Sequence, residues 1–372
     1  MTSTETTRDT AEMAASPLTL RPGAARSRLE ESLLPPIVAL LVAAIVGDAL
    51  ILTFGQSPGE VYRLLLEGTW GNSYGFGQVL YKATTLTFTG LSIAFALRAG
   101  LFNIGAESQL AAGGFVAALV GLVLPGGLSW ILTLPLYVLA AALGGGIVGG
   151  VAGELKSRFG AHEVITTIML NFIVLALLSY LTSTRLKVPE TLHTLEIRSG
   201  AVPRLSDLAS AFHGSAASLV LLLAVIACAG AWWYLFRTRR GFELRAVGLQ
   251  PAAAEYGGVR PGAVWARAMT ISGAIAGLGG LNFVLGYKHY YEEGFAGGAG
   301  FLGIAVALVG GSHPLGVALA ALLFATISQG GLAVNALVPK QFVEVLQAVV
   351  IIAVAASVPE VRRLLRVQRR RD

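Results

Sequence analysis

The most constraining feature of this 372-residue sequence is a series of long apolar runs separated by shorter polar segments. A hydrocarbon core of about 30 Å requires about 20 apolar residues per helix, and a backbone in lipid has to satisfy its own hydrogen bonds. The runs therefore predict an all-α, polytopic membrane protein with about ten transmembrane helices. We place them at about 36–55, 79–97, 106–124, 129–152, 163–183, 216–236, 266–286, 299–311, 315–332 and 341–358.

The composition agrees with this class and excludes several others. Charged residues make up 13% of the chain, against roughly 25% in soluble domains. The 46 glycines lie inside apolar runs, where small residues allow helices to pack closely. The single cysteine, Cys228, lies in an apolar run. The sequence contains no cysteine and histidine spacing typical of a zinc site, no catalytic triad and no phosphate-binding loop. We expect a non-catalytic protein that binds no metal and no cofactor itself. Nucleic acid is not an expected partner, because the basic residues lie between apolar runs.

The distribution of lysine and arginine predicts the orientation. Placing the N-terminus in the cytoplasm puts the arginine-rich stretch 237–267 and the basic C-terminus on the inside, which satisfies the positive-inside rule. We therefore expect a cytoplasmic tail at 1–34, a membrane domain at 35–358 and a basic cytoplasmic tail at 359–372. An even number of spans places both termini inside.

Two polar segments at the starts of spans are candidates for a transport pathway. Residues 100–109 (GLFNIGAESQ) bring Asn103, Glu107 and Gln109 to a predicted helix break. Ionisable residues at membrane depth indicate function by default, although Glu107 could simply cap its own helix. In residues 162–171, Glu163, Thr167 and Asn171 recur every four residues and share one helix face. Such a stripe either lines a pathway or bonds to a neighbouring helix.

Three further segments have two interpretations each. The small-residue run 297–311 indicates close packing or a re-entrant element, and Ser312-His313-Pro314 after it indicates a tight turn or a broken helix. The outer segments 56–78 and 184–215 are either simple connections or a docking surface for an external partner.

The polar stretch 237–267 is too patterned for a plain connection. Gly248, Pro251 and the run Ala252–Ala254 predict a turn that leads into a short helix outside the bilayer, with Pro251 in its first turn. The alternative is an ordinary arginine-rich inside loop.

Four motifs in order resemble the permease subunits of ABC importers in the branched-chain amino acid and ribose superfamily, nearest to the nucleoside, simple-sugar type. They are GLFNIGAESQ at 100–109, HEVITTIMLNF at 162–172, ELRAVGLQPAAAEYGGV at 243–259 and GFLGIAVALVGGSHPLGVALAALLF at 300–324. The resemblance covers about residues 35–358. Gln250 stands where that family usually has Asn, and Gly257 where Ala is common; both departures are mild.

The resemblance implies a type II-importer-like fold with inverted repeats, in the bacterial inner membrane. It implies a second permease subunit, identical or paralogous, two cytoplasmic ABC ATPase subunits that bind ATP and Mg²⁺, and an extracytoplasmic substrate-binding protein. Loop 237–265 would then be the coupling region. The residues implied to meet the ATPase are Glu243, Arg245, Gly248, Pro251, Ala252, Ala254, Tyr256 and Gly257.

The implied substrate is a nucleoside, for which Asn103, Glu107 and Asn171 would supply amide and carboxylate partners. A monosaccharide such as ribose is the alternative within the class. An ion-coupled secondary transporter is the alternative from another class, but its membrane acids would be few, chiefly Asp48 and Glu107. A membrane enzyme is the weakest reading, since no paired acid and base are visible.

Overall fold

The computed structural model describes residues 41–339, 341 and 343–353, which form helices and connections without extended strands. Six helices in these ranges are long and apolar enough to cross a membrane, or seven if one bent pair is counted as a single span. This confirms the prediction of an all-α, polytopic membrane protein. The six are α4 (Ser73–Arg98), α5 (Ala106–Val123), α6 (Trp130–Phe159), α7 (Glu163–Leu181, continued to Leu186 by a π turn), α9 (Val220–Arg237) and α15 (Pro314–Ala333).

The remaining apolar runs form shorter or broken elements. The run predicted at 266–286 is α12 (Pro261–Leu278) followed by α13 (Gly280–Val284), and α12 begins earlier because Pro261 occupies its first turn. The run at 299–311 is α14 (Ala299–Val309). A last apolar helix covers Val343–Ala353. The predicted tails at 1–34 and 359–372 lie outside the described residues.

The first predicted span is bent. The helix Leu41–Thr53 turns by 110° into α3 (Pro58–Glu67). Val61 on α3 and Ile51 before the bend pack with Val334 and Val343, so the beginning and end of the described chain share one apolar cluster. α4 then starts at Ser73 rather than near residue 79, because the Asn72 side chain accepts the Gly75 N–H at 2.6 Å and caps it.

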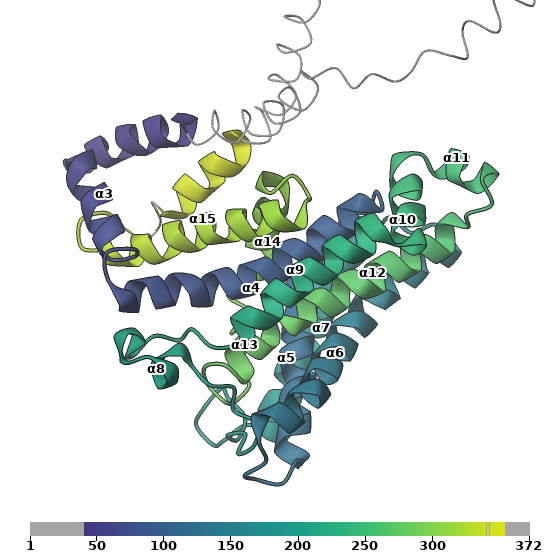
Figure 1. Cartoon of the computed structure of the whole chain (residues 1–372), viewed down its shortest axis with the longest axis horizontal. Coiled ribbons are helices and arrows are strands. Elements are labelled where there is room, and N and C mark those ends of the chain that lie inside the picture. The colour runs from purple at the N-terminus through teal and green to yellow at the C-terminus, as the bar shows by residue number, and fades with distance from the viewer. Residues whose placement is uncertain (1–40, 340, 342, 354–372) are drawn as a thin grey trace, which may run out of the picture.

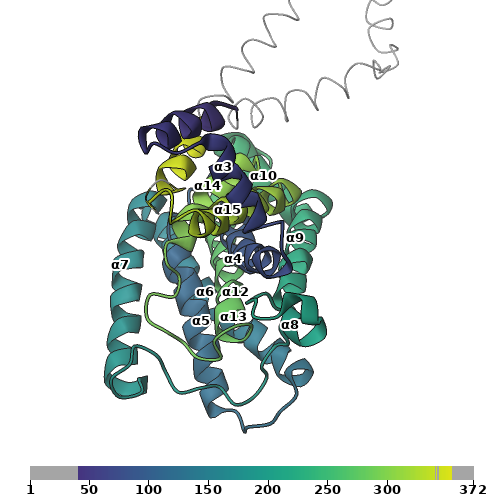
Figure 2. The ribbon, with the colours of Figure 1, turned by 90° about the vertical axis from the view of Figure 1, so that its left-hand side faces the viewer.

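Glycines form the central helix contact. α6 presents Gly145 and Gly149 to Gly273 and Gly277 of α12, and a Cβ atom at any of the four would overlap the backbone of the partner helix. The four-residue spacing on both helices is the small-xxx-small pattern that lets membrane helices approach closely. In Figure 2, α7 and α9 lie at opposite flanks of this central group.

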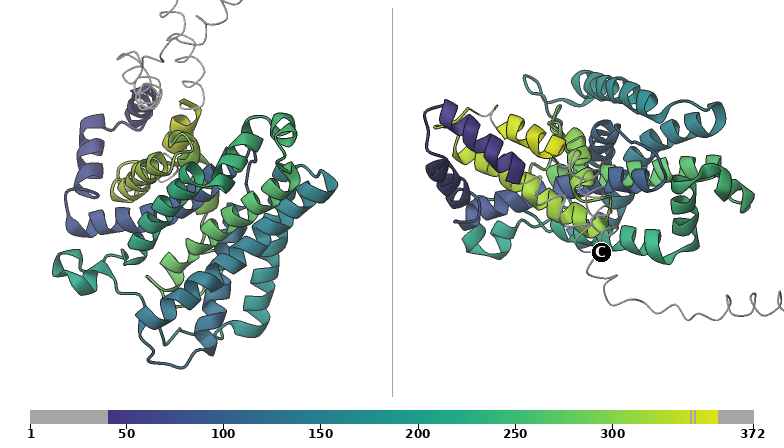
Figure 3. Two further views of the ribbon diagram at one scale, coloured as in Figure 1. Left: turned by 45° about the vertical axis from the view of Figure 1, so that its right-hand side comes forward. Right: turned by 90° about the horizontal axis from the view of Figure 1, so that it is seen from above.

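The two ends of the bundle differ. α10 (Arg239–Leu249) and α11 (Pro251–Tyr256) extend beyond the bundle at one end, as Figure 1 and Figure 3 show. The segment with α8 (Leu205–Leu208) and the 3-10 turn η2 (Ser210–Phe212) lies at the other end. Three isolated bridges tie this second end together: Lys187 with Thr194, His193 with Glu292 and Arg204 with Ser218.

Candidate functional site

Asn103 is the centre of a buried polar network in the connection between α4 and α5. Its Nδ2 donates to Gln109 Oε1 and to Ser272 Oγ, both at 2.8 Å. Its Oδ1 accepts from Gln109 Nε2 at 3.1 Å and from the Gly105 N–H at 3.0 Å. Ser272 in turn donates to the Ser92 carbonyl oxygen at 2.7 Å. The network joins α4, α5 and α12, so the connection is fixed from three sides.

Glu107 caps a helix far away in the sequence. Its carboxylate oxygens accept the N–H groups of Gly298 at 2.8 Å and Gly300 at 2.6 Å, at the start of α14. The Glu107 side chain is buried. A carboxylate at the amino end of a helix satisfies otherwise unpaired N–H groups and complements the helix dipole. Glu107 therefore holds the start of α14 in place.

The predicted polar face of α7 points at the same connection. Asn171 accepts the Ser108 N–H at 3.1 Å and donates to the Ile104 carbonyl oxygen at 2.9 Å. Thr167 Oγ1 accepts the Ile104 N–H at 3.3 Å. The sequence left open whether this stripe lines a pathway or bonds to a neighbour, and these contacts are with a neighbour.

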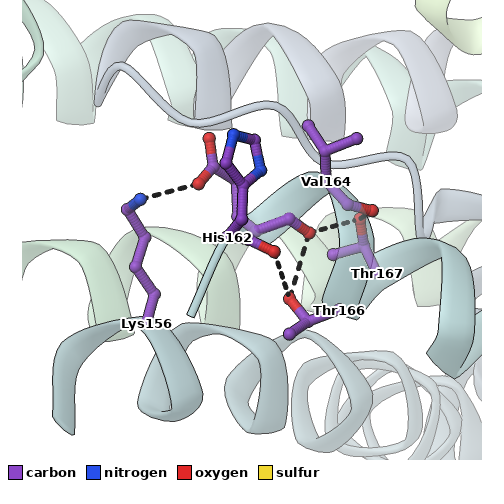
Figure 4. Close-up of polar contacts among 6 residues, drawn as sticks. Lys156, His162, Val164, Thr166 and Thr167 are labelled. Carbon is purple, nitrogen blue, oxygen red and sulfur yellow. Dashed lines mark hydrogen bonds and ion pairs between the residues drawn. The ribbon is translucent and has the colours of Figure 1, made fainter. Parts of the chain in front are cut away.

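Glu163 lies at the end of that face and pairs with α6. Its carboxylate lies 2.6 Å from Lys156 Nζ, in a largely buried ion pair. Figure 4 shows this pair next to the first turn of α7, where Thr166 and Thr167 donate to carbonyl oxygens of the preceding turn. The pair fixes the junction between α6 and α7.

A cavity of about 520 Å³ opens beside the start of α14. Several polar side chains stand in its mainly apolar lining, and we call it the polar cavity. It is lined by residues of α4, α14, α15 and the last helix, and none of the six predicted pathway residues is among them. Its polar lining consists of Tyr81, Lys82, Thr85, Ser328, Glu344 and Gln347. Lys82 Nζ donates to the carbonyl oxygen and to the hydroxyl of Ser328, at 3.3 and 3.2 Å.

Sequence reasoning missed this cavity, although a signal was present. Lys82 and Thr85 fall inside the apolar run 79–97, where a lysine is a functional candidate, but neither is among the residues predicted for the pathway. One of the predicted residues, Glu107, nevertheless contacts the wall of the cavity. Gly297, Gly298 and Ala299 form part of its wall, and Glu107 holds that wall by the bonds to Gly298 and Gly300.

A second cavity, of about 500 Å³, is lined almost wholly by apolar side chains of α4, α9 and α15. Cys228 belongs to its lining and is buried.

The predicted turn and short helix at 248–256 are present. Gly248 lies in the last turn of α10, against the connection after α4: a Cβ atom there would overlap the Arg98 carbonyl oxygen and lie 2.9 Å from the Gly100 nitrogen. Gln250 is extended, and Pro251 occupies the first turn of α11. Gly248 is therefore needed for a close approach, and Pro251 for the start of the helix.

The predicted coupling residues divide into anchors and exposed residues. Glu243 pairs with Arg239 at 3.2 Å and with Arg267 at 3.5 Å. The Arg245 guanidinium lies 5.2 Å from the centre of the Phe236 ring, and Ala254 is buried. In contrast, Pro251, Ala252, Tyr256 and Gly257 are exposed, and Tyr256 is 96% exposed. Leu249 beside them is 85% exposed. An apolar surface therefore stands at the tip of an element that the bundle holds firmly.

Comparisons with known proteins agree with this arrangement. Residues 75–355 match the family model of the branched-chain amino acid transport system permease component. The chain is 37% identical over 338 residues to the guanosine ABC transporter permease protein NupP of Bacillus subtilis, covering 87% of this chain and 93% of that protein. It is 33% identical over 331 residues to the nucleoside ABC transporter permease protein NupB of Lactococcus lactis, covering 87% and 91%.

A third relative has another substrate in its name. The glucose ABC transporter permease protein TsgB13 of Haloferax volcanii is 31% identical over 331 residues, covering 87% of each chain. No solved structure matches the chain significantly. With the helical bundle, the projecting α10–α11 segment and the family match over most of its length, this chain belongs to the branched-chain amino acid transport system permease family of multi-pass membrane transport subunits.

Proposed function

We propose that this chain is the non-catalytic permease subunit of an ATP-driven importer that carries nucleosides. The observation that supports this energy source most directly is the α10–α11 segment, which offers the exposed Leu249 and Tyr256 at the tip of a firmly anchored projection. The relatives named as ABC transporter permeases support an ATPase as the partner that meets it. ATP and Mg²⁺ would be bound by two such ATPase subunits.

The α10–α11 end is the cytoplasmic end in this proposal. Arg98, Lys156, Arg237 and Arg245 are among the basic residues at this end, and the Lys156 ammonium lies 5.1 Å from the centre of the Trp265 ring at the start of α12. At the other end, basic residues alternate with acidic ones such as Glu190, Glu196, Asp207, Glu292 and Glu293. This asymmetry supports the positive-inside orientation in a bacterial inner membrane, with both termini inside.

The polar cavity beside α14 is the part of the translocation pathway that this subunit contributes. A volume of about 520 Å³ lies in the range of small-molecule sites, about 300–1,000 Å³. Its hydroxyl, amide and charged groups suit a neutral solute rich in hydroxyls. The predicted pathway residues support the cavity without lining it, because they fix the α4–α5 connection, the start of α14 and the α6–α7 junction. These residues are Asn103, Glu107, Gln109, Glu163, Thr167 and Asn171.

A nucleoside is the preferred substrate for two reasons. The relatives with the higher identities are named for guanosine and nucleosides. The cavity also carries Tyr81 and Phe295, and an aromatic ring stacks on a nucleobase with about 1–3 kcal/mol. A monosaccharide remains the second candidate, because one relative at 31% identity is named for glucose.

The importer would be completed by a second permease, identical or paralogous, and by an extracytoplasmic binding protein. The second permease would close the pathway, because the described residues leave the cavity partly open. The binding protein would dock at the end that carries α8. Exposed Leu192, Leu195 and Leu208 on the 187–219 segment support a docking role for that surface.

The test is uptake by proteoliposomes that contain the permease pair, the ATPase and the binding protein. We expect uptake of labelled guanosine that excess adenosine or uridine reduces and excess glucose or ribose leaves unchanged. Tyr81→Leu should lower this uptake, whereas Tyr74→Leu, on the same helix but outside the cavity lining, should not. Competition by the sugars alone would reject the nucleoside assignment.

A further inference from the structure

α14 is too short to cross the membrane and behaves as a half-helix. Its 11 residues span about 16 Å, about half of a 30 Å hydrocarbon core. Its amino end, at Gly298, lies at the wall of the polar cavity. Its carboxyl end reaches the turn at Gly310–Ser312, next to Arg98. α14 thus runs from the cavity to the end that carries α10 and α11.

Both ends of α14 are held by one short segment, residues 98–107. Glu107 accepts the N–H groups of Gly298 and Gly300 at the amino end. Arg98 donates from Nε to the Ser312 carbonyl oxygen at 2.8 Å, and from Nη2 to the Gly311 carbonyl oxygen at 3.4 Å, at the carboxyl end. Each charge has the sign that its helix end favours. We call residues 98–107 the bracket.

The side of α14 is also locked. A Cβ atom at Gly300 would overlap the Glu107 backbone, and one at Gly303 would come within 2.6 Å of Thr89 Oγ1. Thr89 Oγ1 donates to the Ala299 carbonyl oxygen at 3.0 Å. Such close contacts leave little room for α14 to slide along its neighbours by itself.

The coupling segment rests on the same bracket. Gly248 of α10 touches the Arg98 carbonyl oxygen and Gly100. The guanidinium groups of Arg98 and Arg245 both lie over the Phe236 ring, at 5.7 and 5.2 Å from its centre. The other end of the bracket is stiffened by the Asn103 network. A displacement of α10 therefore reaches Arg98 first and α14 next.

We propose that the bracket is the mechanical link of this subunit: it makes α14, and with it the cavity wall at Gly297–Ala299, move with the coupling segment. Arg98 and Glu107 are positioning residues in this link. The inference rests on the proposed function, because it takes the ATPase as the source of the displacement. It adds the route by which the nucleotide state reaches the pathway, through packed contacts and a two-state element.

The test follows the cavity wall directly. Ala299 lines the cavity and is partly exposed, and Cys228 is the one cysteine of the chain. In a Cys228→Ala, Ala299→Cys permease assembled with its partners in nanodiscs, maleimide labelling is measured with ADP and with a non-hydrolysable ATP analogue. We expect the labelling rates in the two states to differ by about fivefold or more, as for a typical allosteric coupling.

Arg98→Met should bring the two rates together while ATP hydrolysis continues. Glu107→Gln should do the same in part, because an amide oxygen can still accept one of the two N–H groups. Arg158→Met is the matched control: Arg158 lies near the same end, but its side chain is 71% exposed and pairs only with Glu154 in the described structure. If Arg98→Met does not assemble, Arg98→Lys and Glu107→Gln carry the test.

Two results would overturn the inference. One is a difference between the labelling rates with ADP and with the ATP analogue that persists in both the Arg98 and the Glu107 variants. The other is equal labelling rates in the two nucleotide states when Arg98 and Glu107 are unchanged. The labelling requires no transported solute. A failure of guanosine uptake with an intact labelling response would therefore reject the proposed substrate and leave the bracket standing.

Discussion

Gly248 shows how one missing side chain fixes a contact. Its backbone lies against the carbonyl group of Arg98 and the nitrogen of Gly100, and no atom could be added between them. Gly257, nine positions on, is different: a Cβ atom there would lie 3.3 Å from the Ala254 carbonyl oxygen, and its φ of −77° suits any residue. Gly248 and Gly257 of the coupling segment therefore have separate roles.

We predict that Gly248→Ala separates α10 from the bracket, at a cost of about 1–3 kcal/mol, the usual cost of overpacking. Uptake should fall sharply, and the thermal unfolding temperature of the purified permease should fall with it. Gly257→Ala is the control and should leave both unchanged. Equal behaviour of the two variants would show that the close approach at Gly248 has no role.

Residue types could be predicted from the sequence, but their partners could not. The flanking glycines predicted the helix break at Asn103, and the four-residue spacing predicted the shared face of Thr167 and Asn171. Glu107, however, meets Gly298, which is 191 residues away, and only the packing of α5 on α14 brings them together. The cavity at Tyr81 and Lys82 was missed for the same reason, since its walls come from four separate helices.

At the scale of elements, the coupling segment is an anchored projection. α10 is tied to the bundle through Gly248, Glu243 and Arg245, whereas α11 is exposed on most of its surface. Pro251 and the small residues after it predicted this short helix, because proline favours the first turn. The division into anchored and exposed residues could not be predicted, since it depends on where α4 ends and α12 begins.

We predict that Tyr256→Ala weakens binding of the ATPase by about tenfold or more, because exposed tyrosines at interface centres often contribute about 2 kcal/mol. The stability of the isolated permease should not change, since the Tyr256 side chain is 96% exposed. The measurement is co-purification and titration of the ATPase against the permease in detergent. Tyr74→Ala is the control, because Tyr74 is half exposed at the other end of the bundle. Equal affinity of the ATPase for the two variants would show that Tyr256 is not part of the interface.

The opposite end depends on a half-buried histidine, His289. The His289 carbonyl oxygen accepts the Ile197 N–H at 2.7 Å, which ties the 187–219 segment to the loop before α14. Burial lowers the pKa of the His289 ring, and Arg204 adds to this effect, while Glu196 and Asp207 oppose it. The ring is therefore neutral in the folded protein at neutral pH.

A lowered pKa makes this end less stable in acid. The stabilisation is present above the unfolded pKa of about 6.5 and is lost as the pH falls through the folded value. We predict faster proteolysis of the 187–219 segment at about pH 5 than at about pH 7. His289→Asn, which tolerates the left-handed φ of 61° at this position, should abolish the difference. An unchanged pH dependence in that variant would assign it to another group.

For the whole molecule, hydropathy predicted the architecture and charge predicted a difference between the ends. The prediction of about ten spans corresponds to six full-length candidates and several shorter or bent elements in the described residues. Hydropathy could not distinguish them, because α14 and the bent pair are as apolar as a full span while packing inside the protein or against its ends. The half-helix and the bend are tertiary features.

The central claim is that ATP hydrolysis, delivered through the coupling segment, moves solute through this chain. The most direct measurement is labelled guanosine uptake by proteoliposomes that hold the complete assembly, with ATP clamped at a constant level on the ATPase side and the proton gradient collapsed by an uncoupler. The account predicts that uptake persists with ATP and stops when ATP is replaced by ADP. Uptake that ends with the gradient while ATP is held constant would contradict it and indicate an ion-coupled carrier.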